Sequence, residues 1–152
     1  MRTAIDAFER AKMTENNAAA YGVLTRILLT EGKLSDAQNA AQRALILSQQ
    51  TGSRPPHFDA AVAGARVKAA IGKSKGALQD LQGVLAEATK FGYVPYELEV
   101  RLAIGEIEMQ SGKASTGRPH LEALAKDARA KGFLLIARKA TAAAKVQGSS
   151  HK

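Results

Sequence analysis

The chain has 152 residues, of which 45% are hydrophobic and only 5% aromatic, and its formal net charge is +8. It contains no cysteine, which excludes a disulfide framework and a cysteine-based metal site. No apolar run approaches the roughly 18 residues of a membrane span, and charges interrupt the first residues where a signal peptide needs an apolar stretch.

Glycines recur at a fixed spacing and organise the chain. Three Gly-Lys pairs lie forty residues apart, and one further glycine lies twenty residues after the glycine of each pair. The two sets are Gly32, Gly72 and Gly112, and Gly52, Gly92 and Gly132. Alanine, the best helix former, supplies much of the apolar content. One glycine in every twenty residues therefore predicts helices alternating with turns, which is typical of a stacked helical repeat.

The predicted elements come in pairs along the chain. Residues 1–12 match the end of a repeat whose first helix is missing, which suggests the C-terminal part of a longer protein, with a short native cap as the alternative. Three repeats follow, at 17–52, 57–92 and 97–132. Their first helices are expected at 17–31, 57–71 and 97–111, and their second helices at 35–51, 75–91 and 115–131. A capping helix at 134–146 and a disordered tail at 148–152 complete one all-α domain over 1–147.

Local signals indicate where these helices begin and end. Ser35 and Ser115 are positioned to cap the second helices of their repeats through a side-chain oxygen. The glycines suit the left-handed residue that ends a helix, and the prolines at 55, 56 and 95 follow where a new helix can begin. Pro119 falls inside the helix expected at 115–131, which predicts either a late start or a bent first turn.

Small or apolar residues recur at matching positions of the second helices. Steps of four and three place them on one stripe, which we expect to pack inward. They are Ala37, Ala77 and Gly117, then Ala41, Leu81 and Leu121, then Ala44, Val84 and Leu124.

These features resemble the tetratricopeptide-repeat (TPR) family, in a variant longer than its usual period of about 34 residues. The residues that carry the resemblance are the turn glycines Gly32, Gly72 and Gly112, with Ala37, Ala44 and Ala77 in the second helices. The first helices depart from the family pattern, because its bulky aromatic is present as Tyr21 but replaced by Ala61 and Arg101.

The stretches 93–109 and 132–140 are similar to the C-terminal TPR regions of large bacterial signalling proteins, which carry kinase or winged-helix domains upstream. The resemblance covers about residues 15–146. It implies a right-handed solenoid that binds other proteins or a second copy of itself, and it does not imply kinase activity, because the chain has no kinase motif.

Motifs that could carry chemistry are weak. Gly72-Lys73-Ser74 ends like a phosphate-binding loop, but Val67 occupies the position of its first glycine. The three histidines have no histidine or carboxylate at the helical spacing of a metal site, and the carboxylate pairs 97/99 and 106/108 are expected on solvated faces. We therefore predict a protein that is not an enzyme and needs no cofactor or metal.

The first helices of TPR arrays line a concave surface, where we expect a partner peptide or helix to bind. An apolar strip would give affinity and the charges would give register. The predicted residues are Arg26, Leu29, Phe58, Asp59, Val62, Arg66, Leu98, Glu99, Leu102, Glu106 and Met109. For the apolar residues of the helix at 97–111 two alternatives remain, namely a binding groove or packing on both faces.

The C-terminal end is basic, because residues 113–152 hold nine Lys and Arg against two acidic residues. An alternative partner is therefore a nucleic acid or an acidic protein. The residues of this patch are Lys126, Arg129, Lys131, Arg138, Lys139 and Lys145. A further possibility is a homodimer through the N-terminal end, including Ile5 and Phe8. We expect a cytoplasmic location, with display outside the cytoplasm from a membrane-anchored parent as the alternative.

Overall fold

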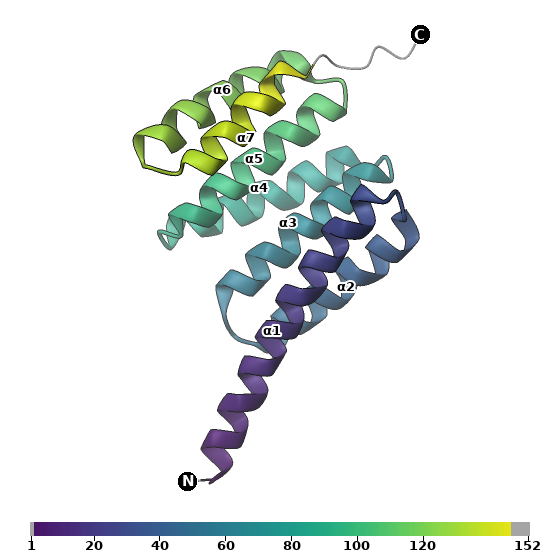
Figure 1. The fold of residues 1–152 in the computed structure, drawn as a ribbon, viewed down its shortest axis with the longest axis vertical. Helices are drawn as coiled ribbons and strands as arrows, with labels where there is room; N and C mark the ends of the chain where they lie inside the picture. The colour runs from purple at the N-terminus through teal and green to yellow at the C-terminus, as the bar shows by residue number, and fades with distance from the viewer. Residues whose placement is uncertain (1, 147–152) are drawn as a thin grey trace. The chain divides into compact units, whose positions relative to one another are not determined.

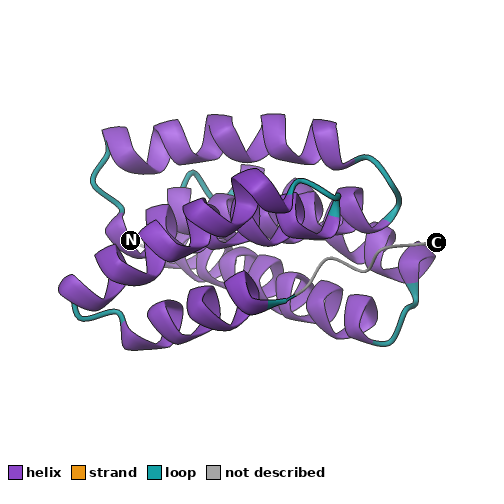
Figure 2. Cartoon of the chain, turned by 90° about the horizontal axis from the view of Figure 1, so that it is seen from above, coloured by secondary structure: helices purple, strands orange, loops and turns teal. Residues whose placement is uncertain are grey.

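The computed structural model describes the backbone of residues 2–146 and the side chains of residues 10–146. Over this range the chain is all-helical, with seven helices and no strand (Figures 1 and 2). The helices are α1 (Arg2–Thr30), α2 (Leu34–Gln50), α3 (Arg54–Ala70), α4 (Ser74–Lys90), α5 (Val94–Gln110), α6 (Ala114–Ala130) and α7 (Leu134–Lys145). The tail predicted to be disordered, 148–152, lies outside the described residues.

The twenty-residue period of the glycines is the period of the helices. Each helix from α2 to α6 has 17 residues, and three residues connect each helix to the next. The predicted all-helical class is thereby confirmed, and consecutive helices follow one another in a repeat-like succession.

Each connector contains a glycine in the left-handed conformation, with φ between 66° and 84°. At the first turn the N–H of Gly32 donates to the carbonyl of Leu29 (3.1 Å), and the N–H of Lys33 donates to that of Leu28 (2.9 Å). These two bonds form a Schellman motif, which satisfies carbonyls at the helix end. The same two bonds recur at Gly72, Gly92 and Gly132, and the left-handed glycine at every turn explains why the glycines predicted the helix ends correctly.

The predicted serine caps are wrong. The carbonyl of Lys33 accepts the N–H of Ala37 (2.9 Å), so Lys33 is the N-cap of α2 and Ser35 is already its second residue. Lys113 has the same place before α6, where the N–H of Gly117 reaches its carbonyl at 2.9 Å. The N-cap of each helix therefore lies two residues earlier than the serine pattern indicated.

Two other boundaries differ from the prediction. The break expected between residues 12 and 17 is absent, because α1 runs without interruption from Arg2 to Thr30. Lys12 stands where the later turns have Gly52 and its equivalents, and a residue with a Cβ resists the left-handed conformation. Helix α6 begins at Ala114 and includes Pro119, which rules out the late start.

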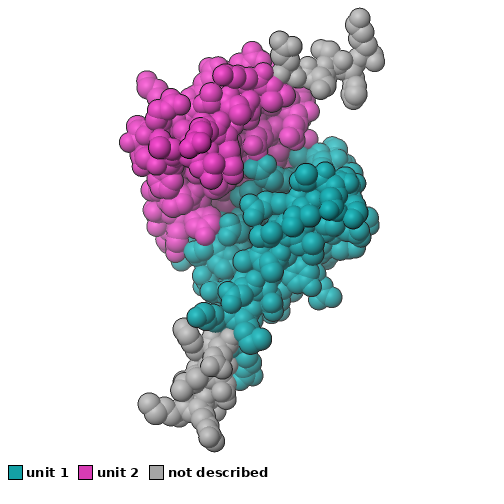
Figure 3. All heavy atoms as spheres, viewed as in Figure 1, with its two compact units in different colours: residues 1–73 teal, residues 74–152 magenta. Residues whose placement is uncertain are grey.

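The chain divides into two compact units, Met1–Lys73 and Ser74–Lys152 (Figure 3). In the first unit, α1 packs against α2 and α3, and α2 packs against α3. In the second unit, α5 packs against α4, α6 and α7, and α6 packs against α7. The single domain expected over 1–147 stays a prediction.

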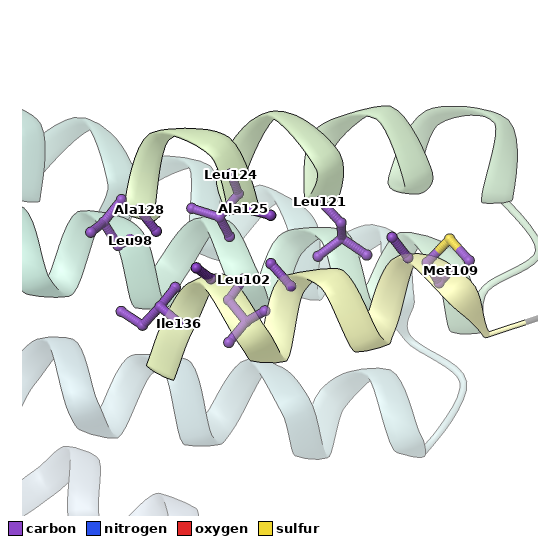
Figure 4. Packing of buried hydrophobic residues seen from close by; sticks show 11 residues of the cluster. Leu98, Leu102, Met109, Leu121, Leu124, Ala125, Ala128 and Ile136 are labelled. Atoms are coloured by element: carbon purple, nitrogen blue, oxygen red, sulfur yellow. The ribbon is translucent and has the colours of Figure 1, made fainter. Parts of the chain in front are cut away.

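Each unit contains a cluster of buried apolar side chains. In the first unit, Ala37 and Ala41 of α2 pack against Val67 of α3, with Leu28 and Leu29 at the edge. In the second unit, leucines of α5 and α6 pack against α7 (Figure 4). All nine residues of the predicted inward stripe are buried, so that prediction is confirmed.

Helices α5 and α6 approach closely where two glycines face each other across the pair. A methyl group placed on Gly117 would lie 3.0 Å from the carbonyl oxygen of Gly105 and 2.9 Å from Cβ of Glu108. One placed on Gly105 would lie 2.6 Å from Cγ of Leu121. The absence of side chains at these two positions therefore sets the spacing of the two helices.

Candidate interaction surfaces

The six predicted partner-binding residues of the first unit lie on α1 and α3, two helices in contact. Arg26 and Asp59 are exposed, and Leu29, Val62 and Arg66 are half-buried. Phe58 is fully buried and belongs to the core. Five of the six side chains therefore combine charge with partly accessible apolar surface, as a surface that binds a peptide would require.

The five predicted residues of the second unit lie on α5, and the apolar ones are core residues. Leu98, Leu102 and Met109 are at most 5% exposed. They form one cluster with α6 and with Ile136 of α7 (Figure 4). Of the two alternatives for this helix, the structure supports packing on both faces. These three residues therefore belong to the core and offer a partner almost no accessible surface.

Glu99 and Glu106 of α5 remain half-buried beside this core. Helix α7 covers the apolar side chains between them, which sequence reasoning had assigned to a groove. The reason for the difference is that a capping helix needs an apolar face to pack on, and α5 supplies it. A groove that continues from α3 to α5 stays a prediction, because the two helices belong to different units.

All six residues of the alternative basic patch are exposed. They lie on α6, on the turn after it and on α7. Lys131 is engaged within the fold, since its Nζ lies 3.1 Å from a carboxylate oxygen of Asp127. Arg101 of α5 donates to the other oxygen of the same carboxylate. These hydrogen bonds, first that of Arg101 and then that of Lys131, lower the pKa of Asp127.

One polar pair was missed by the sequence reasoning. Glu108, expected on a solvated face, is buried, and its Oε2 lies 2.7 Å from Nδ1 of His120. The pair joins α5 to α6 across twelve residues, so the three- and four-residue spacing of a single helix could not reveal it. Nearby, Nε of Arg118 donates to the carbonyl of Ala144 (3.1 Å) at the end of α7. Both contacts tie helices of the second unit together.

The phosphate-loop resemblance of Gly72-Lys73-Ser74 has a structural explanation. The N–H of Gly72 donates to the carbonyl of Ala69 (3.0 Å), and that of Lys73 donates to the carbonyl of Lys68 (2.9 Å). A phosphate-binding loop must present such N–H groups to its ligand. Here they close a Schellman turn like those at Gly32, Gly92 and Gly132.

A stripe of exposed apolar residues on α1 was also missed. It consists of Met13, Ala20, Val23, Leu24 and Ile27, and the three larger residues of its second half are 41–50% exposed. The signal in the sequence is the spacing of seven residues from Met13 to Ala20 and from Ala20 to Ile27. The predicted N-terminal contact residues Ile5 and Phe8 have side chains outside the described part.

The described residues contain neither a cluster of metal ligands nor a helix that could span a membrane. Between residues 10 and 146, no three His, Asp or Glu side chains gather in a way that could hold a metal ion. None of the helices described combines the length and apolarity needed to cross a bilayer.

Comparison with models of protein families, with curated proteins and with solved structures finds no match to this chain. The class that the structure defines is a repeat-like protein built only from helices in its described part.

Proposed function

We propose that the chain is a non-catalytic scaffold for protein–protein interaction, built as a right-handed TPR-like solenoid. The observation that carries the proposal is the repetition of one unit, a 17-residue helix and a three-residue turn, with inward residues forty positions apart. Repeats of this kind form extended binding surfaces rather than enclosed catalytic clefts. The resemblance to the TPR regions of bacterial signalling proteins agrees with this function.

The partner surface proposed for the first unit consists of Arg26, Leu29, Asp59, Val62 and Arg66. Half-buried Leu29 and Val62 offer apolar contact, and the two arginines favour a partner peptide or helix with acidic residues. Helices α1 and α3 pack against each other and against α2. The proposed surface is therefore ordered before a partner binds.

A display library of random peptides tests this function. Peptides selected on the intact chain are measured by calorimetry against Arg26→Glu with Arg66→Glu, which should weaken binding about tenfold or more. The matched control is Arg43→Glu with Lys73→Glu, two exposed residues of the same unit, which should leave affinity unchanged. The proposal is refuted if no peptide is selected, or if both double variants bind equally well.

The six exposed cations of α6, α7 and the turn between them support a second candidate, the binding of a nucleic acid or an acidic protein. Phosphate contacts would make affinity fall steeply with salt. A gel shift with double-stranded DNA and with single-stranded RNA at low and moderate salt decides the nucleic-acid form of this candidate. No shift at low salt eliminates it.

A further inference from the structure

The exposed face of α7 carries only apolar and positively charged side chains. Its two leucines, both in the first turn, are 54% and 62% exposed. At 3.6 residues per turn, all exposed residues of the helix fall on one continuous arc about 140° wide. No acidic residue follows Asp127 in the chain. The exposed residues of α7 are Leu134, Leu135, Arg138, Lys139, Ala142 and Lys145.

The opposite face of α7 is fixed in the core of the second unit. Ile136, Ala137, Ala140 and Ala144 are buried in one cluster with side chains of α5 and α6 (Figure 4). The hydroxyl of Thr141 donates to the carbonyl of Ala137 (2.8 Å) and is thereby satisfied within the helix. The helix cannot turn its leucines inward without breaking this packing, so its exposed face is a fixed surface.

This face differs from the equivalent face of α5. Forty residues before Arg138 and Lys145, α5 has Leu98 and Gly105. Leu98 is buried in the cluster with α6 and α7, and Gly105 lies against α6. Cations therefore stand in α7 where α5 packs on other helices, and a cation is costly to bury against an apolar helix. The charge of the face favours a negatively charged surface instead.

Further cations lie at both ends of α7. Nε of Arg118 donates to the carbonyl of Ala144 (3.1 Å), which holds a guanidinium group at the C-terminal end of the helix. Arg129 is exposed in the last turn of α6, which a three-residue turn joins to the start of α7. Lys131 in that turn is engaged with Asp127. An anionic surface that meets α7 would therefore find positive charge along the whole helix.

The two leucines decide which anionic surface fits best. The phosphates of a nucleic acid would match the cations, but they offer no apolar contact to Leu134 and Leu135. A partner helix usually binds in an apolar groove, whereas the exposed face of one helix is convex. A bilayer with anionic lipids presents phosphates at its surface and hydrocarbon directly beneath them. Helices with leucines among basic residues bind such surfaces.

We propose that the exposed face of α7 binds the surface of a bilayer that contains anionic lipids (Figure 1). Leu134 and Leu135 enter the interfacial region, while Arg138, Lys139 and Lys145 contact headgroup phosphates. The helix lies along the bilayer and does not cross it. This surface belongs to the second unit, so the proposal goes beyond the peptide-binding function and does not rest on it.

Flotation of the full chain with lipid vesicles tests the proposal. Binding is expected to phosphatidylcholine vesicles with about 30% phosphatidylglycerol, but not to pure phosphatidylcholine, and it should fall with salt. Arg138→Gln with Lys139→Gln should weaken binding about 10- to 30-fold, since both cations lie close to the anionic surface. The matched control, Arg43→Gln with Lys75→Gln, removes two exposed cations elsewhere and should stay within about threefold. No binding to anionic vesicles at low salt overturns the proposal.

A second pair of variants tests the apolar contact. Leu134→Gln with Leu135→Gln should weaken vesicle binding about tenfold or more. Leu34→Gln with Ile46→Gln, at exposed positions of α2, should leave it unchanged. Far-UV circular dichroism confirms that the variants remain folded. If the α7 leucine variant binds vesicles as tightly as the wild type, charge alone acts and the proposed seating is wrong. A chain that shifts double-stranded DNA but leaves the vesicles unbound assigns this face to nucleic acid instead.

A fluorescent probe shows which face meets the bilayer, because the chain has no native tryptophan. The emission of Leu135→Trp should shift to the blue on addition of anionic vesicles and be quenched by lipids with brominated acyl chains. The emission of Ile46→Trp should not change. Floating chains with unchanged emission at position 135 would place another face on the bilayer and overturn the proposal. No peptide is present, so failure here leaves the peptide-binding function untouched, and the reverse also holds.

Discussion

The contact between α5 and α6 gives the sharpest prediction about stability, through Gly117→Ala. The new methyl group would lie 3.0 Å from the carbonyl oxygen of Gly105 and 3.0 Å from the backbone nitrogen of Met109. Both neighbours are backbone atoms of α5, so the helices must move apart by a few tenths of an ångström. Overpacking of this kind costs about 1–3 kcal/mol. Alanine recovers about 0.5–1 kcal/mol of backbone entropy in a helix, so the net loss is centred on about 1 kcal/mol and is at most about 2.5 kcal/mol.

Urea unfolding followed by circular dichroism measures this loss. The matched control is Gly83→Ala in α4, an exposed helical position of the same unit where a methyl group meets no atom within 4 Å. It should stabilise the chain by about 0.5–1 kcal/mol, because only the entropy gain remains. The two substitutions are chemically identical, so their opposite signs isolate the helix contact. If Gly117→Ala proves as stable as Gly83→Ala, the close approach of α5 and α6 is wrong.

A double-mutant cycle extends the test to the other glycine of the contact. Gly105→Ala would bring its methyl group 2.6 Å from Cγ and from Cδ2 of the fully buried Leu121. Leu121→Ala alone should cost about 2–5 kcal/mol through the cavity that it leaves. The two together should cost less than their sum by about 0.5 kcal/mol or more, because each relieves the other. Simple additivity would show that the two residues are not in contact.

Three further predictions follow from single residues. Gly112→Ala should destabilise the chain by about 1–2 kcal/mol in urea unfolding, because φ at this turn is +79°; no loss would contradict the turn geometry. Leu102→Ala should cost about 2–5 kcal/mol in the same assay, whereas Leu135→Ala at an exposed position should stay within about 0.5 kcal/mol, and a tolerated Leu102→Ala would return this residue to the groove. The pKa of Asp127 is lowered in the folded state, so this carboxylate stabilises the fold above about pH 4 and the contribution disappears as the pH falls through the folded pKa. Asp127→Asn should therefore flatten the fall of Tm below about pH 4, and an unchanged acid profile would contradict the Arg101 and Lys131 contacts.

The sequence predicted the helical succession because its signals are local. A glycine that must adopt positive φ, as at Gly52 and Gly92, determines a turn wherever it stands. The inward stripe of the second helices was equally accessible, since steps of three and four define a face before any partner is known. The turn expected after residue 12 is absent for a local reason as well. Lys12 stands where the later repeats have a glycine, and α1 continues through this position.

The candidate surface was harder to predict because exposure depends on which helix lies next. Leu102 and Met109 have the spacing of a groove, and only the position of α7 shows that they are covered. The Glu108–His120 pair lies between helices, where the sequence gives no spacing rule. Charged side chains such as Arg26 and Asp59 were placed correctly at the surface, because burying an unpaired charge is costly wherever it lies.

Equivalent positions of a repeat therefore have different physical roles at different points of the chain. Val67 is core because α2 lies against it, while Ile27, forty residues earlier, has the same place in its helix and remains half exposed. Val23, Leu24 and Ile27 of α1 are 41–50% exposed, and exposure of apolar side chains to water is unfavourable by about 25 cal/mol for each Å². The equivalents of Val23 and Ile27 in α3 and α5 avoid this cost because they are buried.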